Sequence, residues 1–289
     1  MDWKTMMYNE RFPKSNKYSP EFVAENQMGP NSIWLMEWLT EKIEIKKNMK
    51  VLDLGCGRAI SSIFLAEEFG ATVYATDLWI DVSENRKRIV EFSLEDKIIP
   101  IKAEAHALPF AKSFFDVIVA VDSYGYFGTD DLYLSYITGF LKPGGVIAAV
   151  LPGLMRDFDN FKVPEHLFKP QKNGDVFWEP DCFTFHTKDW WLSHWMKTSL
   201  VEVEIYDTLE DGYKHWAKQE KALELAGLNI FPSVEETLLN DAGRYIGFVR
   251  IIATKNIPET EESLPHAWQP EFSAVCDSLR NERDSRKKV

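Results

Sequence analysis

A short apolar segment that runs into two glycines constrains the fold of this chain more than any other feature. Residues 51–54 are apolar apart from Asp53, and Gly55-Cys56-Gly57 follows directly. Residues 60–69 then have the pattern of a helix that ends at Gly70. Glycines at such a turn let the backbone approach a ligand that a Cβ atom would exclude. The segment predicts a strand, a ligand-binding loop and a helix in succession.

Strand and helix patterns alternate on both sides of this loop. The apolar runs that we interpret as further strands cover residues 72–76, 98–102, 115–121, 146–151, 200–206 and 245–254. The helical patterns between them cover residues 81–94, 133–141, 188–197, 215–225 and 234–242. Strands that alternate with helices form βαβ crossovers and a parallel sheet covered on both faces. The sequence therefore predicts an α/β fold with a doubly wound, mostly parallel sheet, and either of the last two strands could form its edge.

Charge and cysteine content exclude several classes of protein. The 289 residues include 45 acidic and 33 basic side chains, which gives a net charge of -12. This charge repels phosphodiester backbones and anionic lipids, so we expect no nucleic acid and no membrane as partner. Three widely spaced cysteines and the lack of about 18 consecutive apolar residues indicate a cytoplasmic protein. The spacing of the histidines predicts no metal site.

Asp77 indicates the class of ligand that the glycine loop binds. It ends the second predicted strand, 20 residues after Gly57 (77 minus 57). A carboxylate in that place of a doubly wound sheet reaches the hydroxyls of a ribose. The third glycine of the dinucleotide fingerprint is replaced by Ile60, and Asp53 at the turn disfavours a pyrophosphate. The pattern predicts a nucleoside that carries positive charge, and a nicotinamide oxidoreductase is disfavoured.

Five segments in order resemble the motifs of class I S-adenosylmethionine-dependent methyltransferases. The resemblance is strongest to the small-molecule branch that includes the ubiquinone and menaquinone methyltransferases, and it covers about residues 48–152. The matching segments are residues 51–57, Asp77, residues 103–110, residues 113–118 and residues 141–145. The resemblance implies a Rossmann-like fold of seven strands with an N-terminal arm and a cap inserted after the fifth strand. It also implies S-adenosyl-L-methionine as the cofactor.

The resemblance assigns cofactor contacts to individual residues. Asp53, Gly55 and Gly57, with Cys56 between them, would surround the methionine part, and Asp77 would hold the ribose. Leu78 would cover the adenine, with Trp79 as a possible addition, and Glu104 and Ala105 would contact the adenine edge, although the family more often has Asp at position 104. Asp122 would lie near the methionine amine or the methyl group. If these assignments are right, the named residues lie around one common site.

Methyl transfer from a sulfonium needs alignment and the exclusion of water more than acid-base chemistry. Ligands of open α/β sheets lie beyond the carboxyl ends of the strands, so Asp122 and Tyr124 are the candidate catalytic residues, with Tyr126 nearby. The segment Asp122-Ser123-Tyr124-Gly125 lacks the Pro-Pro signature of enzymes that methylate amines in DNA. We therefore expect a small-molecule acceptor. The alternatives are a cyclopropane-type lipid-modifying enzyme and a non-catalytic S-adenosylmethionine-binding module.

The pattern divides the chain into five segments. Residues 1–47 form an arm with a first helix, and the arm is either a lid over the site or a hydrophobic cover on that helix. Residues 48–152 form the cofactor-binding core, and residues 197–257 supply the remaining strands and helices. Residues 153–196 form an aromatic-rich insertion whose Trp178, Trp190, Trp191 and Trp195 either cage the acceptor or pack against the sheet. We expect residues 258–289 to form a tail and the chain to act as a monomer or homodimer.

Overall fold

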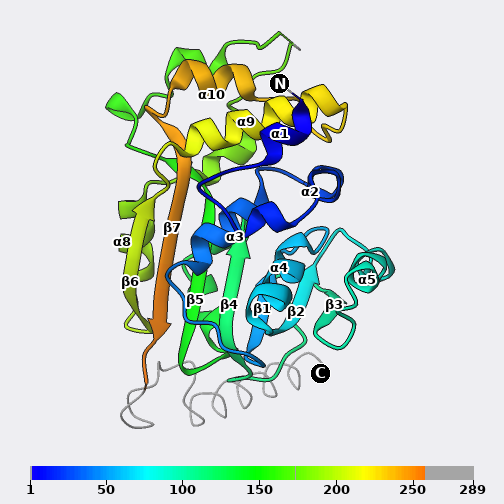
Figure 1. Ribbon diagram of the computed structural model, residues 1–289. Coiled ribbons are helices and arrows are strands. Elements are labelled where there is room, and N and C mark those ends of the chain that lie inside the picture. Colours follow the sequence, from blue (N-terminus) through cyan, green and yellow to red (C-terminus); the bar gives the residue numbers. More distant parts are fainter. Residues whose placement is uncertain (1, 173, 258–289) are drawn as a thin grey trace, which may run out of the picture. The chain divides into compact units, whose positions relative to one another are not determined.

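Seven strands form one sheet in the order β3-β2-β1-β4-β5-β7-β6 within the part of the chain that the computed structural model describes, residues 2–172 and 174–257 (Figure 1). The strands are β1 Lys50–Leu54, β2 Thr72–Asp77, β3 Ile98–Lys102, β4 Phe115–Val121, β5 Leu141–Leu154, β6 Val201–Thr208 and β7 Ile246–Lys255. Strands β1 to β5 pair in parallel, whereas β7 runs antiparallel between β5 and β6. The predicted doubly wound, mostly parallel sheet is confirmed, and β6 is its edge.

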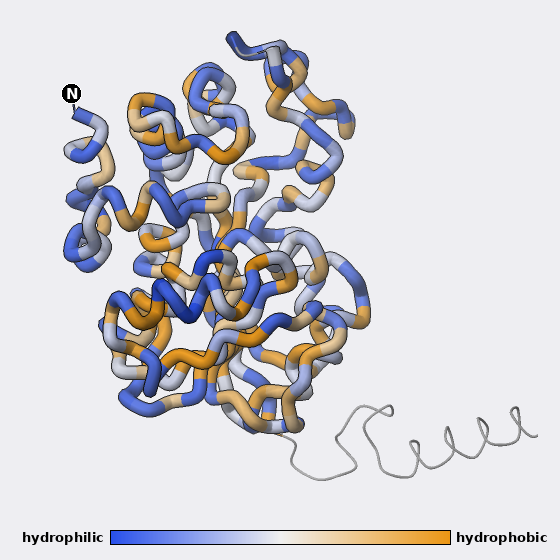
Figure 2. Tube along the Cα trace, turned by 90° about the vertical axis from the view of Figure 1, so that its right-hand side faces the viewer, coloured by the Kyte–Doolittle hydropathy of each residue, from blue (hydrophilic) through white to orange (hydrophobic). Residues whose placement is uncertain are grey.

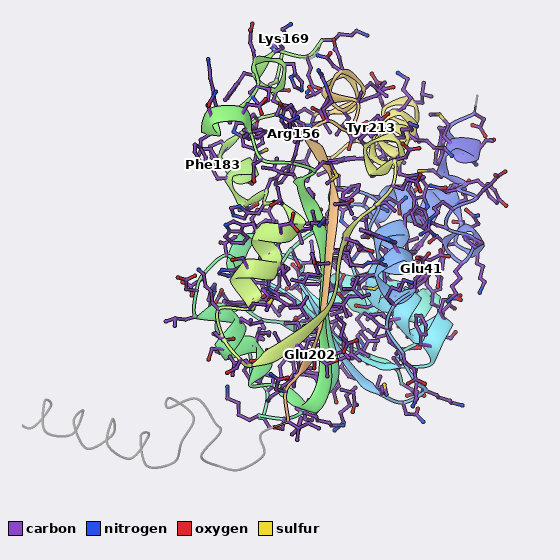
Figure 3. The ribbon with its side chains drawn as sticks, turned by 90° about the vertical axis from the view of Figure 1, so that its left-hand side faces the viewer. Glu41, Arg156, Lys169, Phe183, Glu202 and Tyr213 are labelled. Atoms are coloured by element: carbon purple, nitrogen blue, oxygen red, sulfur yellow. The ribbon has the colours of Figure 1, made fainter. Side chains whose placement is uncertain are left out.

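The helices are α1 Trp3–Met7, α2 Pro20–Asn26, α3 Ser32–Thr40, α4 Ile60–Phe69, α5 Val82–Glu91, α6 Gly125–Gly128, α7 Tyr133–Thr138, α8 Lys188–Trp195, α9 Gly212–Ala226 and α10 Glu235–Asp241. Short 3-10 helices cover Ser15–Lys17, Asp159–Phe161, Glu165–Phe168 and Pro180–Thr184. α3 packs on α4 and on β4 and β5, and α8 packs on β6 and β7. Figure 3 shows α8 and the N-terminal helices on opposite faces of the sheet, as the crossover pattern predicts.

The expected helix over residues 133–141 is shorter in the structure. α7 ends at Thr138, and Leu141 already pairs with Phe115 as the first residue of β5. A register shift between Phe115 and Val117 accommodates the Lys-Pro-Gly-Gly segment within this strand. The turn residues therefore lie inside an irregular strand rather than between a helix and a strand, because pairing with β4 begins before them.

A cover of helices lies beyond the carboxyl ends of the parallel strands. α1 and α10 both pack on α9, and Figure 1 shows these helices with α2 at that end of the sheet. Hydrophobic and hydrophilic residues alternate along them (Figure 2), which is typical of helices that are buried on one side. Residues 212–241 thus contribute to the cover together with the inserted segment, whose 3-10 helix Glu165–Phe168 packs on α10. The reason is topological, because β6 ends and antiparallel β7 begins at this end.

The strands in the middle of the sheet are buried on both faces. Residues 147–151 of β5 and residues 117–120 of β4 are at most 2% exposed. A sheet covered on both faces requires continuous apolar runs rather than an alternating pattern. This burial explains why the sequence shows such runs in these segments.

Three of the four tryptophans of residues 178–195 are buried in the core, namely Trp178, Trp191 and Trp195, whereas Trp190 is partly exposed. Trp191 and Trp195 lie one turn apart on α8, are fully buried, and contact Tyr124 at ring-centroid distances of 5.7 and 5.6 Å. Trp190 stacks between the rings of His186 and His194. The packing alternative of the sequence analysis is therefore the one that the structure shows, and the aromatic cage is wrong for these side chains.

Replacing Trp191 by alanine is expected to lower the free energy of unfolding by about 3–5 kcal/mol, because a large buried ring leaves a cavity. Trp79 is 70% exposed, so Trp79→Ala is the matched control and should change stability by less than about 0.5 kcal/mol. Urea unfolding monitored by circular dichroism measures both. Equal losses for the two variants would contradict the assignment of Trp191 to the core.

Candidate functional site

A cavity of about 490 Å³ opens at the carboxyl ends of the parallel strands. Its walls come from the loop after β1, the end of β2, residues 103–106 after β3, residues 121–123 after β4 and the segment between α2 and α3. The chain order reverses here, because β1 pairs with β2 on one side and with β4 on the other. Ligands of open α/β sheets bind at such a switch point, and the volume is typical of ligand sites. This cavity is the candidate site.

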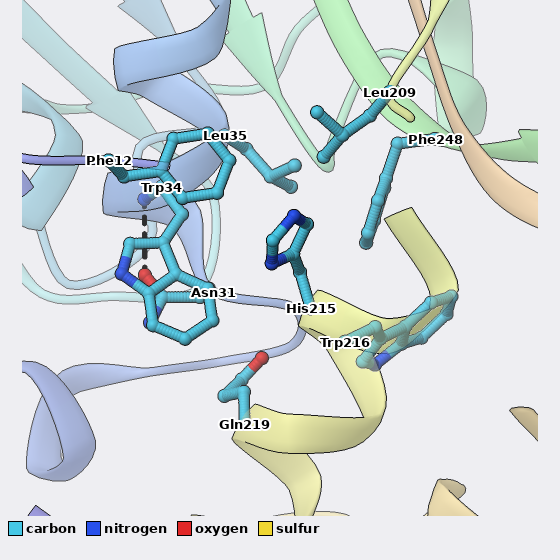
Figure 4. Close-up of a pocket in the computed structure, with 9 residues that line it drawn as sticks. All are labelled: Phe12, Asn31, Trp34, Leu35, Leu209, His215, Trp216, Gln219 and Phe248. Atoms are coloured by element: carbon cyan, nitrogen blue, oxygen red, sulfur yellow. Dashed lines mark hydrogen bonds between the residues drawn. The ribbon is translucent and has the colours of Figure 1, made fainter. Parts of the chain in front are cut away.

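A second cavity of only about 10 Å³ lies between α3, α9 and β7 (Figure 4). Figure 4 shows His215 and Gln219 of α9 facing the aromatic rings of Phe12 and Trp34. This space is about the size of one water molecule. It is a packing gap beneath the cover and too small for a metabolite.

The glycine loop is held against the end of β4. Gly55 has a φ of +73°, and a Cβ atom there would lie 2.5 Å from the Cβ of Ser123. The Ser123 hydroxyl donates a hydrogen bond to the carbonyl of Leu54 at 2.6 Å. Gly57 also has a positive φ, and a Cβ atom there would lie 3.1 Å from the Met28 sulfur. The sequence predicted close approach to a ligand, and the structure shows that the approach of two protein segments also requires Gly55.

Gly55→Ala is expected to destabilise the fold by roughly 1–3 kcal/mol more than Gly227→Ala, because only the first also creates an overlap. Gly227 has a similar φ of +68° but no neighbouring atom within 4 Å of an added Cβ. Both variants incur the cost of a left-handed L-residue, about 1–2 kcal/mol. Urea unfolding of both proteins measures the difference. Equal destabilisation would show that the loop does not pack on Ser123.

Asp77 lines the cavity at the end of β2, as the sequence predicts. Its carboxylate accepts hydrogen bonds from the backbone N–H groups of Gly57 at 2.8 Å, Trp79 at 2.8 Å and Ile80 at 2.9 Å. A carboxylate has about four acceptor positions, so roughly one remains for a ligand. Asp77 therefore both fixes the glycine loop and presents an acceptor to the cavity.

Asp53 lies outside the cavity, unlike its neighbours Gly55, Cys56 and Gly57. Its side chain turns toward the first turn of α4, where Oδ2 accepts hydrogen bonds from the hydroxyls of Ser61 and Ser62, both at 2.6 Å. Burial raises the pKa of Asp53 to about 6, although the two serine hydroxyls oppose this shift. Asp53 thus supports the start of α4, where a carboxylate also interacts favourably with the positive end of the helix dipole. The expected direct contact with a ligand is not supported by this placement.

The residues expected at an adenine lie together on one wall. Leu78 and Trp79 follow β2 and are largely exposed, and Ala105 lies after β3. Glu104 pairs with His106 through Oε1 and Nδ1 at 2.7 Å, and Oε2 accepts the backbone N–H of His106 at 3.0 Å. These hydrogen bonds lower the pKa of Glu104. The wall therefore combines apolar surface with a fixed carboxylate.

Asp122 lines the cavity immediately after β4 with a φ of +56°. Its backbone N–H donates to the carbonyl of Val150 at 2.8 Å, which fixes the turn. A Cβ atom on Gly29 would overlap its carboxylate, so this glycine lets the covering segment approach. Burial alone raises the pKa of Asp122 to about 8, because no described residue donates a hydrogen bond to its carboxylate. Such a carboxyl group is poised to accept a proton or a cation.

Tyr124 lies outside the cavity, although the sequence named it a catalytic candidate. It precedes α6, and its fully buried ring contacts Trp191, Trp195 and Tyr133 on the opposite face of the sheet. The short helix after β4 turns this ring away from the strand ends, so the prediction for Tyr124 is wrong in its placement. Tyr126, two residues later, does line the cavity.

The segment between α2 and α3 supplies a wall that sequence reasoning missed. Met28, Gly29 and Pro30 line the cavity, whereas Phe12 packs on Trp34 and His215. The aromatic residues of the arm thus anchor it to helices, and its last residues border the cavity. The dipeptide Gly29-Pro30 indicated a turn in this segment. The contact of Gly29 with Asp122 joins residues more than 90 positions apart, so no local sequence pattern could predict it.

The cavity is predominantly acidic. Its walls carry the carboxylates of Asp77, Glu104, Asp122 and Asp181 and the single guanidinium group of Arg58. Within the described residues no group of three or more His, Cys, Asp or Glu side chains is arranged to hold a metal ion. None of the helices in the same part of the chain has the length and hydropathy to span a membrane. The lining favours an organic ligand with positive charge.

Comparisons with known proteins agree with this geometry. The family model described as "Methyltransferase domain" matches residues 51–145. Methyltransferase GfsG of Streptomyces halstedii is 34% identical over 119 residues, which cover 39% of this chain and 41% of that protein. Demethylmenaquinone methyltransferase of Listeria monocytogenes is 30% identical over 161 residues, which cover 50% of this chain and 65% of that protein. The chain thus spans less than two thirds of either relative.

The fold is also similar to that of a solved structure. The crystal structure of a putative sarcosine dimethylglycine methyltransferase from Galdieria sulphuraria superposes with a TM-score of 0.62 at 17% identity. The alignment covers 86% of this chain and 91% of that one, so the shared fold extends beyond the matched domain. The predicted Rossmann-like methyltransferase fold is confirmed. The family match shows that residues 51–145 form a methyltransferase domain, and the strand order and the glycine loop are those of the class I, Rossmann-like methyltransferase fold.

Proposed function

We propose that this protein transfers the methyl group of S-adenosyl-L-methionine to a small-molecule acceptor. The observation that carries the proposal is the convergence of the glycine loop, Asp77 and Asp122 on one acidic cavity at the switch point of the sheet. The names of the relatives, which include methyltransferases that act on a quinone and on a sterol, support a small acceptor. Fold alone does not settle function, so the proposal rests on the site.

The residues present fit the proposed cofactor. Asp77 has roughly one free acceptor position for a ribose hydroxyl, and Leu78, Trp79 and Ala105 offer apolar surface for an adenine. The carboxylate of Asp122 has no protein partner among the described residues and suits an amine or a sulfonium. Bound S-adenosylmethionine supplies a methyl group on a positively charged sulfur, and the bonding electron pair stays on the sulfur when the methyl group leaves.

The contribution of the protein is positioning and the exclusion of water. The backbone of Gly55 and Gly57 lines the cavity, and Met28 and Pro30 border it from the covering segment. An acceptor held beside Asp122 is kept near the end of β4, and alignment of reactants can lower a barrier by about 7–11 kcal/mol. The carboxylate of Asp122 receives a proton when the acceptor needs to lose one.

Two measurements test the proposal. Isothermal titration calorimetry of the wild-type protein with S-adenosylmethionine and S-adenosylhomocysteine should show one site. Incubation of methyl-labelled cofactor with a metabolite extract should then yield a small labelled product. Binding without any labelled product would favour a non-catalytic module, and labelled phospholipid would favour the lipid-modifying alternative. If neither form of the cofactor binds, the proposed methyl transfer and its two alternatives are all refuted.

We further propose that the protein acts in the cytoplasm as a monomer or homodimer, without nucleic acid or a membrane as partner. The net charge of -12 supports this proposal, as do two free buried thiols, Cys56 and Cys182. Light scattering after size exclusion measures the oligomeric state. Cell fractionation with an antibody tests the location, and recovery in the membrane fraction would contradict the proposal.

A further inference from the structure

We propose that the methyl acceptor is an amine that enters the cavity as an ammonium ion and gives a proton to Asp122. This inference rests on the proposed function and names the class of its acceptor. If the cofactor lies against the glycine loop, Asp77 and Glu104, the remaining wall belongs to the acceptor. The side chains that remain there include those of Met28, Asp122, Tyr126, Asp181 and Phe231.

The charge of this remaining wall favours a cation. It carries two carboxylates, and among the described residues that line the whole cavity Arg58 is the single lysine or arginine. Arg58 follows Gly57 in the glycine loop, and its guanidinium group donates a hydrogen bond to the backbone carbonyl of Glu25 in α2 at 2.7 Å. An anionic acceptor, such as a carboxylate or a phosphate ester, would meet the charge of Asp181 and, at a pH near or above 8, also that of ionised Asp122. Such an acceptor is therefore disfavoured.

The two carboxylates act on the same part of the cavity. Asp122 and Asp181 both contribute, after burial, to a pKa of about 12 for Tyr126, so both charges lie near this phenol. Tyr126 and Phe231 are more than half exposed although they line the cavity, so their ring faces are available to a ligand. A cation beside carboxylates and over aromatic rings gains from both interactions. A neutral alcohol of the same shape can donate a hydrogen bond to a carboxylate, but it lacks the positive charge that both interactions favour.

The proton and electron balance of the step is simple. An ammonium ion has no lone pair, so it must lose a proton before it can attack. The carboxylate of Asp122 accepts that proton, and the amine nitrogen then forms a bond to the methyl carbon while the carbon–sulfur bond breaks. The products are a methylated ammonium ion, neutral S-adenosylhomocysteine and protonated Asp122. Release of that proton to water restores the site.

Three probes of one shape and different charge test the inference. Calorimetry of the protein saturated with S-adenosylhomocysteine should show that phenethylamine binds about tenfold tighter than 2-phenylethanol, which corresponds to about 1.4 kcal/mol. The anion 3-phenylpropionate should bind more weakly than both. Asp122→Asn should abolish the preference for the amine, and Asp181→Asn should reduce it. The matched control Asp96→Asn removes an exposed carboxylate outside the cavity and should keep the preference.

The outcomes separate this inference from the proposed function. Failure of S-adenosylhomocysteine to bind contradicts the proposed function. Normal binding of S-adenosylhomocysteine overturns the amine assignment if the alcohol or the anion binds as tightly as the amine, if no amine binding is detected, or if folded Asp122→Asn keeps the preference. Thermal unfolding of each variant shows that it is folded. A labelled product whose methyl group resides on nitrogen would support the inference, and one on oxygen or carbon would oppose it.

Discussion

Replacing Asp77 by alanine is expected to weaken the binding of S-adenosylhomocysteine by about 100-fold. The substitution removes one acceptor for a ligand hydroxyl, and a hydrogen bond to a charged group contributes about 1.5–3 kcal/mol. It also removes the acceptor of the backbone N–H groups of Gly57, Trp79 and Ile80, so the loop loses its preformed shape. Preformed loops bind more tightly because less ordering accompanies binding. Isothermal titration calorimetry measures the change directly.

A matched control separates binding from folding. Asp96 is exposed and outside the cavity, so Asp96→Asn changes the net charge by the same amount and should leave the affinity unchanged. Thermal unfolding of Asp77→Ala shows whether the sheet is intact. A folded Asp77→Ala protein with wild-type affinity would remove Asp77 from the cofactor site and would weaken the proposed function.

The affinity for S-adenosylmethionine is expected to rise by up to about tenfold per pH unit between pH 6 and 8 and to level off above pH 8. Burial raises the pKa of Asp122 to about 8 in the protein without ligand, so this carboxyl is mostly protonated at pH 6. A cationic ligand binds the ionised form, and binding must therefore release a proton below the pKa. Calorimetry in buffers of different ionisation enthalpy measures that release.

Asp122→Asn is the matched variant, because it keeps the shape and removes the ionisation. Its affinity should be independent of pH over this interval. The stability of the unliganded protein changes with pH in the opposite direction. A carboxyl group whose pKa is raised in the folded protein contributes stability that is lost as the pH rises from about 4 to 8. Asp122→Asn should therefore unfold at a higher temperature than the wild type at pH 8. The same pH slope in both proteins would show that another group binds the proton.

Local patterns in the sequence were sufficient for the sheet and for one side of the site. The apolar run, the glycine loop and the carboxylate at Asp77 lie within 27 residues, from 51 to 77, and each acts where a strand meets a turn. Their roles follow from backbone geometry, which a short segment determines. For the same reason the sequence could place Asp122, which directly follows a strand.

Side-chain direction was harder to predict. Asp53 and Tyr124 stand beside correctly placed residues, yet one turns toward α4 and the other packs on α8. Both depend on which helix packs behind the strand end. The tryptophans of α8 illustrate the same limit, because an amphipathic spacing is common to a packed helix and to a binding surface.

The sequence by itself determined the parallel core, the glycine loop after β1 and the positions of Asp77 and Asp122 at strand ends, because strand, turn and helix signals act over a few residues. Only the tertiary structure decided what closes the cavity. The segment with Gly29 and the side chain of Phe231 reach it from positions more than 200 residues apart, and Phe231 lies in the loop that connects α9 with α10. Contacts of this kind have no local signature, since they arise from packing between distant segments.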